Sequence, residues 1–161
     1  MIIRKSYKFY AAHRNAQLDD KCRNLHGHRY GIFVSFRVER SGSYTTLFND
    51  FDSKIEPFLK QNYDHAMLVD RNDSLMPYLR MYEQDTGDKL RLNLFDYPTT
   101  VENIAYKLFN EFTEMGFAVE EINVKETDSS EFLYTREDWI ADQRRITELS
   151  RPRENSSFVQ T

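Results

Sequence analysis

Three histidines in the first part of the chain carry the clearest chemical signal in the sequence. His26 and His28 flank Gly27 in an HGH triplet, and His13 lies upstream of it. Side chains two residues apart on a strand project from the same face, so both imidazoles of the triplet can reach one ion. Three neutral imidazoles suit zinc, and a catalytic zinc keeps its fourth position for water or substrate. The sequence therefore predicts a zinc site with an open position, held by His13, His26 and His28.

One cysteine and one Asp-His pair are further candidates for proton transfer. Cys22, the only cysteine, lies shortly before His26, where a nearby cation would favour its thiolate form. Asp64 precedes His65 in the motif YDHAML, and a carboxylate beside an imidazole can orient it and stabilise its protonated form. Each feature also has a structural interpretation, because single cysteines are often small buried hydrophobes and Asp-His pairs occur at helix ends without function. The residues alone leave both interpretations open.

Two extended segments must position the histidines. Residues 2–12 alternate partly between apolar and polar side chains, and residues 26–40 are rich in aromatic and β-branched residues with a period of two. We expect the two segments to pair as an antiparallel ribbon, because consecutive strands are usually neighbours in a sheet. Such pairing would bring His13 beside the HGH triplet.

Two amphipathic helices are expected after these strands. Asp50 is placed as the cap of a helix that runs to about Asn62. Thr99 and Glu102 fit a capping box in front of a second helix, which Gly116 ends. We therefore assign Asp50 and Glu102 to helix capping and not to catalysis.

The rest of the chain predicts shorter elements within one domain. That domain is expected to cover residues 1–149, with 150–161 as an unpacked C-terminal tail. The further elements are a short amphipathic segment near 75–82, a strand-like LRLNLF, strands at 119–124 and 131–134, and a C-terminal helix marked by Trp139, Ile140, Ile146 and Leu149.

The composition limits which binding partners and which cellular compartment we expect for this protein. The single cysteine permits no intrachain disulfide and suits a reducing cytoplasm. A formal net charge of -4 gives no basic field for nucleic acid, and no apolar run approaches the length that spans a bilayer. The N-terminus MIIRKSYKFYAAH also lacks the apolar region of a signal peptide. We expect a cytoplasmic protein with neither a nucleic-acid nor a membrane partner.

Six short motifs occur in the order and approximate spacing of the 6-pyruvoyltetrahydropterin synthase family. They are FYAAH, CRNLHGHRY, NDF, YDHAML, PTTVEN and VKET, and they cover about residues 5–135. The resemblance implies the tunnelling fold, an α+β unit in which an antiparallel four-stranded sheet carries two helices on one face and assembles into an oligomeric barrel. A homo-oligomer would follow, with a hexamer of two trimers as the expected assembly and active sites between subunits.

The resemblance also implies roles for particular residues and a substrate, 7,8-dihydroneopterin triphosphate. The carboxylate of Glu126, which matches the family's pterin anchor, can accept two parallel hydrogen bonds from the 2-amino group and ring N–H of a pterin. The implied zinc ligands are His13, His26 and His28; the proton-transfer residues are Cys22, Asp64 and His65; the pterin anchor is Glu126. Candidates for phosphate contacts are Arg14, Lys21, Arg23 and Arg29.

The cysteine spacing favours one branch of the family. CRNLHGH resembles the 6-carboxytetrahydropterin synthases of 7-deazaguanine and queuosine biosynthesis, which release acetaldehyde and triphosphate. The alternative is a 6-pyruvoyltetrahydropterin synthase of the biopterin pathway, which usually has a longer insert. A third branch, which serves folate synthesis, has glutamate in place of Cys22, so the cysteine argues against it. The alternative of another class is a non-catalytic zinc-binding scaffold, and the open three-histidine set argues against that.

Overall fold

Two long antiparallel strands form the centre of the sheet. β1 (Ile2–His13) pairs with β2 (His26–Arg37), from Ile2 opposite Arg37 to His13 opposite His26. The computed structural model describes residues 1–18 and 20–145. Alternate residues of β1 are buried, as the partial alternation in the sequence predicts. The expected antiparallel ribbon is thereby confirmed.

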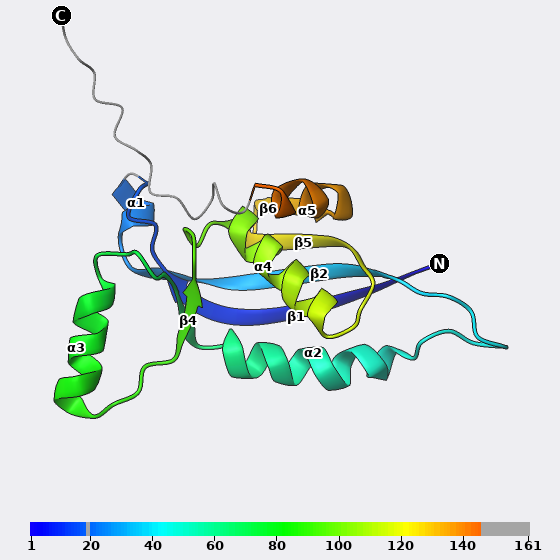
Figure 1. Cartoon of the computed structure of the whole chain (residues 1–161), viewed down its shortest axis with the longest axis horizontal. Helices are drawn as coiled ribbons and strands as arrows, with labels where there is room; N and C mark the ends of the chain where they lie inside the picture. Colours follow the sequence, from blue (N-terminus) through cyan, green and yellow to red (C-terminus); the bar gives the residue numbers. More distant parts are fainter. Residues whose placement is uncertain (19, 146–161) are drawn as a thin grey trace, which may run out of the picture.

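Four shorter strands extend this ribbon into a sheet with the order β4-β3-β1-β2-β5-β6 (Figure 1). β3 (Ala66–Asp70) pairs parallel with the end of β1, and β4 (Leu92–Phe95) pairs parallel with β3. On the other side, β5 (Val119–Thr127) pairs antiparallel with β2 and forms a hairpin with β6 (Ser130–Thr135). The described residues thus form a mixed sheet with an antiparallel centre.

Five helices lie within the described residues. They are α1 (Asp20–Arg23), α2 (Phe48–Asn62), α3 (Met76–Thr86), α4 (Val101–Glu114) and α5 (Arg136–Gln143). In the described part of the chain, none of these has both the length and the apolar character needed to cross a membrane.

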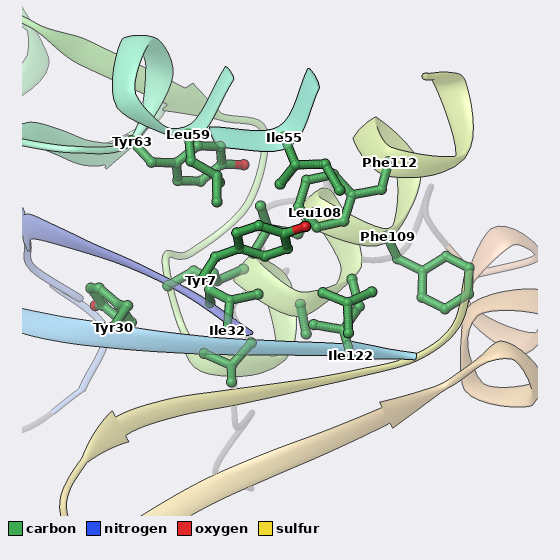
Figure 2. Packing of buried hydrophobic residues seen from close by; sticks show 14 of the residues in the cluster. Tyr7, Tyr30, Ile32, Ile55, Leu59, Tyr63, Leu108, Phe109, Phe112 and Ile122 are labelled. Carbon is green, nitrogen blue, oxygen red and sulfur yellow. The ribbon is translucent and has the colours of Figure 1, made fainter. Parts of the chain in front are cut away.

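The core lies between α2, α4 and one face of the sheet. Ile55 and Leu59 of α2 recur at helical spacing, as do Leu108 and Phe112 of α4, and all four are buried. Figure 2 shows these side chains pointing toward Tyr7, Ile32 and Ile122, which come from β1, β2 and β5. Two helices on one face of the sheet are therefore confirmed.

The helix starts differ from those expected. α2 begins at Phe48, and Asp50 lies within its first turn, where its carboxylate accepts a hydrogen bond from the backbone N–H of Leu47 at 3.0 Å. Asp50 therefore stabilises the helix start from inside the helix. The capping box expected at Thr99 and Glu102 is wrong, because Thr100 is the N-cap residue of α4. The Thr99 hydroxyl instead contacts the loop after β1, with the Arg14 carbonyl oxygen and Asn15 Oδ1 each 3.3 Å away.

The element count also needs a correction. The sheet has six strands among the described residues, where the resemblance implied four, because β3 and β4 add a parallel edge. The sequence predicted β4 and only an amphipathic segment where the helix α3 forms, and β3 begins inside the motif YDHAML, which was assigned no strand. α5 forms around Trp139, whose ring stacks on that of Phe109 with centroids 5.0 Å apart. Ile146, Leu149 and the expected tail at 150–161 lie outside the described residues.

Truncation of a core ring tests this packing. Phe112 is fully buried, so Phe112→Ala should lower the free energy of unfolding by about 3–5 kcal/mol through lost burial and a residual cavity. Phe48→Ala is the matched control, because the Phe48 ring is 65% exposed, and it should cost less than about 1 kcal/mol. Urea unfolding of both variants measures the difference. Equal losses would contradict the placement of α4 over the sheet.

Candidate active site

The register of β1 and β2 brings the three histidines together. His13 lies directly opposite His26, and His28 lies opposite Ala11, two positions along on the same strands. One ring nitrogen from each of the three histidines lies within 4.8 Å of the others. Their ring centroids are 4.6 to 5.2 Å apart. This arrangement can hold a metal ion.

Backbone carbonyl groups orient two of these imidazoles. Nδ1 of His13 lies 2.9 Å from the carbonyl oxygen of Thr99, and Nδ1 of His26 lies 2.7 Å from that of Asn24. An N–H donated to a carbonyl group places the proton on Nδ1 and leaves the Nε2 lone pair for an ion. Nε2 of His13 is buried and has no hydrogen-bond partner within the described residues. A metal ion would satisfy this nitrogen, so the donor set fits the expected cofactor.

The electrostatics of the site favour the metal-binding form of the histidines. Burial lowers the pKa of His13 and of His28 below the ordinary histidine value. Both imidazoles are therefore neutral at pH 7, and a neutral imidazole is the form that binds a metal ion.

Glu126 lies beside the histidines and is held by Tyr30. Its Oε1 atom is 3.5 Å from Nε2 of His13 and 3.7 Å from Nε2 of His28. The fully buried Tyr30 hydroxyl donates to the same oxygen at 3.2 Å. Burial and the nearby Glu126 carboxylate raise the pKa of Tyr30 far above its ordinary value, so the hydroxyl stays a donor. The pattern of the sequence did not single out Tyr30, although it shares a strand face with His26 and His28.

Asp64 and His65 form a second polar pair in the turn after α2. Oδ2 of Asp64 lies 2.8 Å from Nδ1 of His65, and Oδ1 accepts the backbone N–H of Tyr10 at 2.9 Å. This direct contact occurs because His65 adopts a left-handed conformation with φ of 57°. The Tyr10 N–H, followed by the contact with His65, lowers the pKa of Asp64, so its carboxylate is ionised at neutral pH. An ionised carboxylate can hold the His65 imidazole in a fixed orientation.

One cavity of about 1000 Å³ joins the two groups. His28 and Glu126 line it from the metal side, and Asp64 and His65 line it from the turn after α2. Cys22 is an exposed free thiol on α1 and is not among the described residues that line this cavity. Its carbonyl oxygen accepts the backbone N–H of Asn15 at 2.8 Å, which closes the loop between β1 and α1. Within one chain, His28 and Glu126 thus share a cavity with the Asp-His pair, and Cys22 does not line it.

Of the four candidate residues for phosphate contacts, only one lines the cavity. Arg14 forms an ion pair with the buried Asp73, with Nε and Oδ2 3.1 Å apart, so its guanidinium is engaged in the fold. Lys21 and Arg23 are exposed on α1. Arg29 is exposed and lines the cavity, so it is the one residue of the four that lies there.

The family model of 6-pyruvoyl tetrahydropterin synthase matches residues 2–137. The chain belongs to this family. Two relatives named 6-carboxy-5,6,7,8-tetrahydropterin synthase come from Rickettsia conorii and Haemophilus influenzae. The first is 28% identical over 74% of this chain and 89% of its own length. The second is 29% identical over 80% of this chain and 94% of its own.

Solved structures confirm the fold of this member of the 6-pyruvoyl tetrahydropterin synthase family. The Plasmodium vivax 6-pyruvoyltetrahydropterin synthase superposes with a TM-score of 0.61 at 18% identity, covering 84% of this chain and 98% of that one. An uncharacterized protein of Wolinella succinogenes superposes with a TM-score of 0.69 at 20% identity, and the match covers 84% of this chain and 98% of that one. The expected tunnelling fold is therefore confirmed.

Loss of one histidine tests the metal site. His13→Ala removes a buried ligand, so zinc affinity should fall by more than the 10- to 100-fold that loss of an outer hydrogen-bond partner typically costs. His65→Ala is the matched control, because His65 lines a cavity with His28 but lies outside the group of three, so this variant should bind zinc as the unaltered protein does. Bound metal per chain, measured by mass spectrometry after dialysis, checks both. Equal zinc contents would contradict the assigned ligands.

Proposed function

We propose that the chain is a zinc-dependent 6-carboxytetrahydropterin synthase. It would convert 7,8-dihydroneopterin triphosphate to 6-carboxy-5,6,7,8-tetrahydropterin, with release of acetaldehyde and triphosphate, in 7-deazaguanine and queuosine biosynthesis. The observation that carries the proposal is the group of three histidines beside Glu126, because one of them, His28, and Glu126 line one cavity with Asp64 and His65. The names of the curated relatives support the same reaction.

Zinc is the proposed metal, held by His13, His26 and His28. Imidazole nitrogens suit zinc, and three protein ligands are the number that catalytic zinc sites use. When bound, zinc would act as a Lewis acid that makes a coordinated group more acidic. The carbonyl groups of Thr99 and Asn24 keep His13 and His26 in the tautomer that presents Nε2.

Glu126 is the proposed anchor for the pterin ring. A carboxylate can accept the 2-amino and ring N–H groups of a pterin in parallel. The Tyr30 hydroxyl holds Oε1 of Glu126 at 3.2 Å and thereby fixes the direction of the carboxylate. Tyr30 is therefore proposed as a positioning residue for Glu126.

Cys22, Asp64 and His65 are the proposed proton-transfer residues. The Asp64 carboxylate holds the His65 imidazole, which is 76% exposed and can reach a substrate in the cavity. Cys22 is exposed and does not line this cavity within one chain, so the proposal requires that another copy of the chain completes each site. A cytoplasmic homo-oligomer, with a hexamer of two trimers as the expected form, is thus part of the proposal.

Two alternatives remain testable. A 6-pyruvoyltetrahydropterin synthase would use the same zinc and pterin groups, and the matching family model and several solved neighbours carry that name. A non-catalytic zinc-binding scaffold would keep the three histidines and would have no use for an oriented Asp64–His65 pair.

Product analysis decides among these functions. Zinc-loaded protein is incubated with 7,8-dihydroneopterin triphosphate, and the pterins are identified by mass spectrometry alongside an acetaldehyde assay. We expect carboxytetrahydropterin and acetaldehyde in equal amounts, because cleavage of the side chain yields both. Pyruvoyltetrahydropterin without acetaldehyde would favour the biopterin-type reaction. Absence of turnover by zinc-loaded protein would favour the scaffold.

Replacement of the thiol separates catalysis from metal binding. Cys22→Ala should lower kcat by about 100-fold or more, because it removes a proton acceptor, while zinc content stays unchanged. Gln17→Ala is the control, since Gln17 is also exposed in the loop between β1 and α1. Turnover rates and bound zinc are measured for both variants. A Cys22→Ala enzyme with normal kcat would exclude the thiol from the reaction.

A further inference from the structure

Asp64 and His65 are the two central residues of a tight turn whose first residue is Tyr63. The backbone N–H of Ala66 donates to the carbonyl oxygen of Tyr63 at 3.1 Å and closes this turn. Among the described residues, His65 is the only one other than glycine with a positive φ, at 57°. Such a conformation persists only where neighbouring contacts hold it. The contacts of Tyr63 therefore influence the position of both polar side chains.

Tyr63 is anchored in the core by its ring and by its hydroxyl group. The side chain is fully buried, and its ring lies against that of Phe9 with centroids 5.0 Å apart. The hydroxyl donates to Oε2 of Glu111 on α4, which is 48 residues away in the chain. Burial, followed by the nearby Glu111 carboxylate, raises the pKa of Tyr63 well above its ordinary value, so the hydroxyl stays a donor. The start of the turn is thus tied to a helix that is remote in the sequence.

Lys107 keeps Glu111 suited to this contact. Its ammonium group, one helical turn earlier on α4, lies 2.9 Å from Oε1 of Glu111. The side chains of Lys107 and Glu111 are only 23% and 18% exposed. Burial raises the pKa of Glu111, and the positive charge of Lys107 opposes that rise and favours the ionised carboxylate. One oxygen of Glu111 therefore serves Lys107, and the other serves Tyr63.

Stability alone gives no reason for these polar groups in the core. Replacement of a buried ion pair by apolar side chains is often neutral or stabilising, so such a pair is weak evidence for a role in stability. A hydrogen bond instead fixes a direction and a distance, which apolar contacts do not. Here that constraint acts on the turn itself, because Tyr63 directly precedes Asp64 and its carbonyl group closes the turn.

We propose that Tyr63 and Glu111 are positioning residues that set the place of the Asp64–His65 pair. The inference rests on the proposed function, in which this pair transfers protons. Asp64 accepts the backbone N–H of Tyr10 at 2.9 Å, so the pair is held between β1 and the anchored Tyr63. Displacement of a reacting group by about 1 Å can cost about 100-fold in rate, so loss of the anchor should slow the reaction.

NMR spectra of zinc-loaded protein with isotope-labelled histidine test the inference without turnover. Tyr63→Phe should shift the ring signals of His65, which His65→Ala identifies. Tyr134→Phe is the matched control, because Tyr134 on β6 is also buried and its hydroxyl donates to Oδ2 of Asp142 at 2.9 Å. Each variant leaves a carboxylate without its tyrosine donor, so both should lose similar stability. Unchanged His65 signals in Tyr63→Phe, as in the control, would overturn the proposal.

Kinetics with 7,8-dihydroneopterin triphosphate separate positioning from binding. Tyr63→Phe and Glu111→Ala should each lower kcat about tenfold and leave KM and zinc content unchanged, because the turn moves without loss of a substrate contact. Glu111→Gln should retain most of the activity, since its amide oxygen can still accept the Tyr63 hydroxyl. The Tyr63→Phe/Glu111→Ala double variant should be no slower than either single variant. A normal kcat in Tyr63→Phe, beside an inactive His65→Ala, would contradict the positioning role.

The two measurements distinguish a failure of this inference from a failure of the proposed function. Normal turnover by His65→Ala would overturn the proposed proton-transfer role, and the NMR spectra would still decide whether Tyr63 positions the pair. If Tyr63→Phe does not fold, Glu111→Ala tests the same contact from the side of α4.

Discussion

The register between β1 and β2 is the constraint on which the rest of the structure depends. It places His13 opposite His26 and, through the same alternation, sends Tyr7 and Phe9 into the core. A slip by one residue would turn every side chain of β1 to the other face. Burial of the aromatic residues therefore fixes the metal site as well. Stability and the positions of the ligands are coupled because one strand carries both.

Buried polar contacts fix the orientation of the site's side chains, which strand pairing alone does not set. Thr99 belongs to the segment before α4, yet its carbonyl group orients His13 at the end of β1. Tyr30 links the strand that bears the HGH triplet to Glu126 on β5. Such groups are costly to bury without partners, so each contact also favours the arrangement of the elements that meet there. Packing of α4 against the sheet and orientation of the ligand set thus depend on each other.

The parallel edge of the sheet supports the Asp64–His65 turn. β3 begins directly after His65, and β4 pairs with β3 along its length. Arg91, just before β4, donates to the carbonyl oxygens of Lys60 and Asp64 at 3.1 and 3.0 Å. These bonds hold the end of α2 and the left-handed His65 in place. The segment between 70 and 97 therefore helps to position the polar pair, which gives this elaboration of the fold a structural reason.

The sequence by itself determined the central ribbon, the two core helices and the three histidines, because strong periodicity and an HGH spacing are local signals that packing does not override. The sequence did not reveal β3, because this strand is short and begins within the motif YDHAML. It also favoured Thr99 as a helix cap, although the contact partner of Thr99 is His13, 86 residues away in the chain. The tertiary structure alone decided that Arg14 is engaged by Asp73, that Tyr30 holds Glu126 and that Cys22 lies apart from the cavity. Each of these depends on which distant residue a side chain meets, and a pattern along one chain carries no such information.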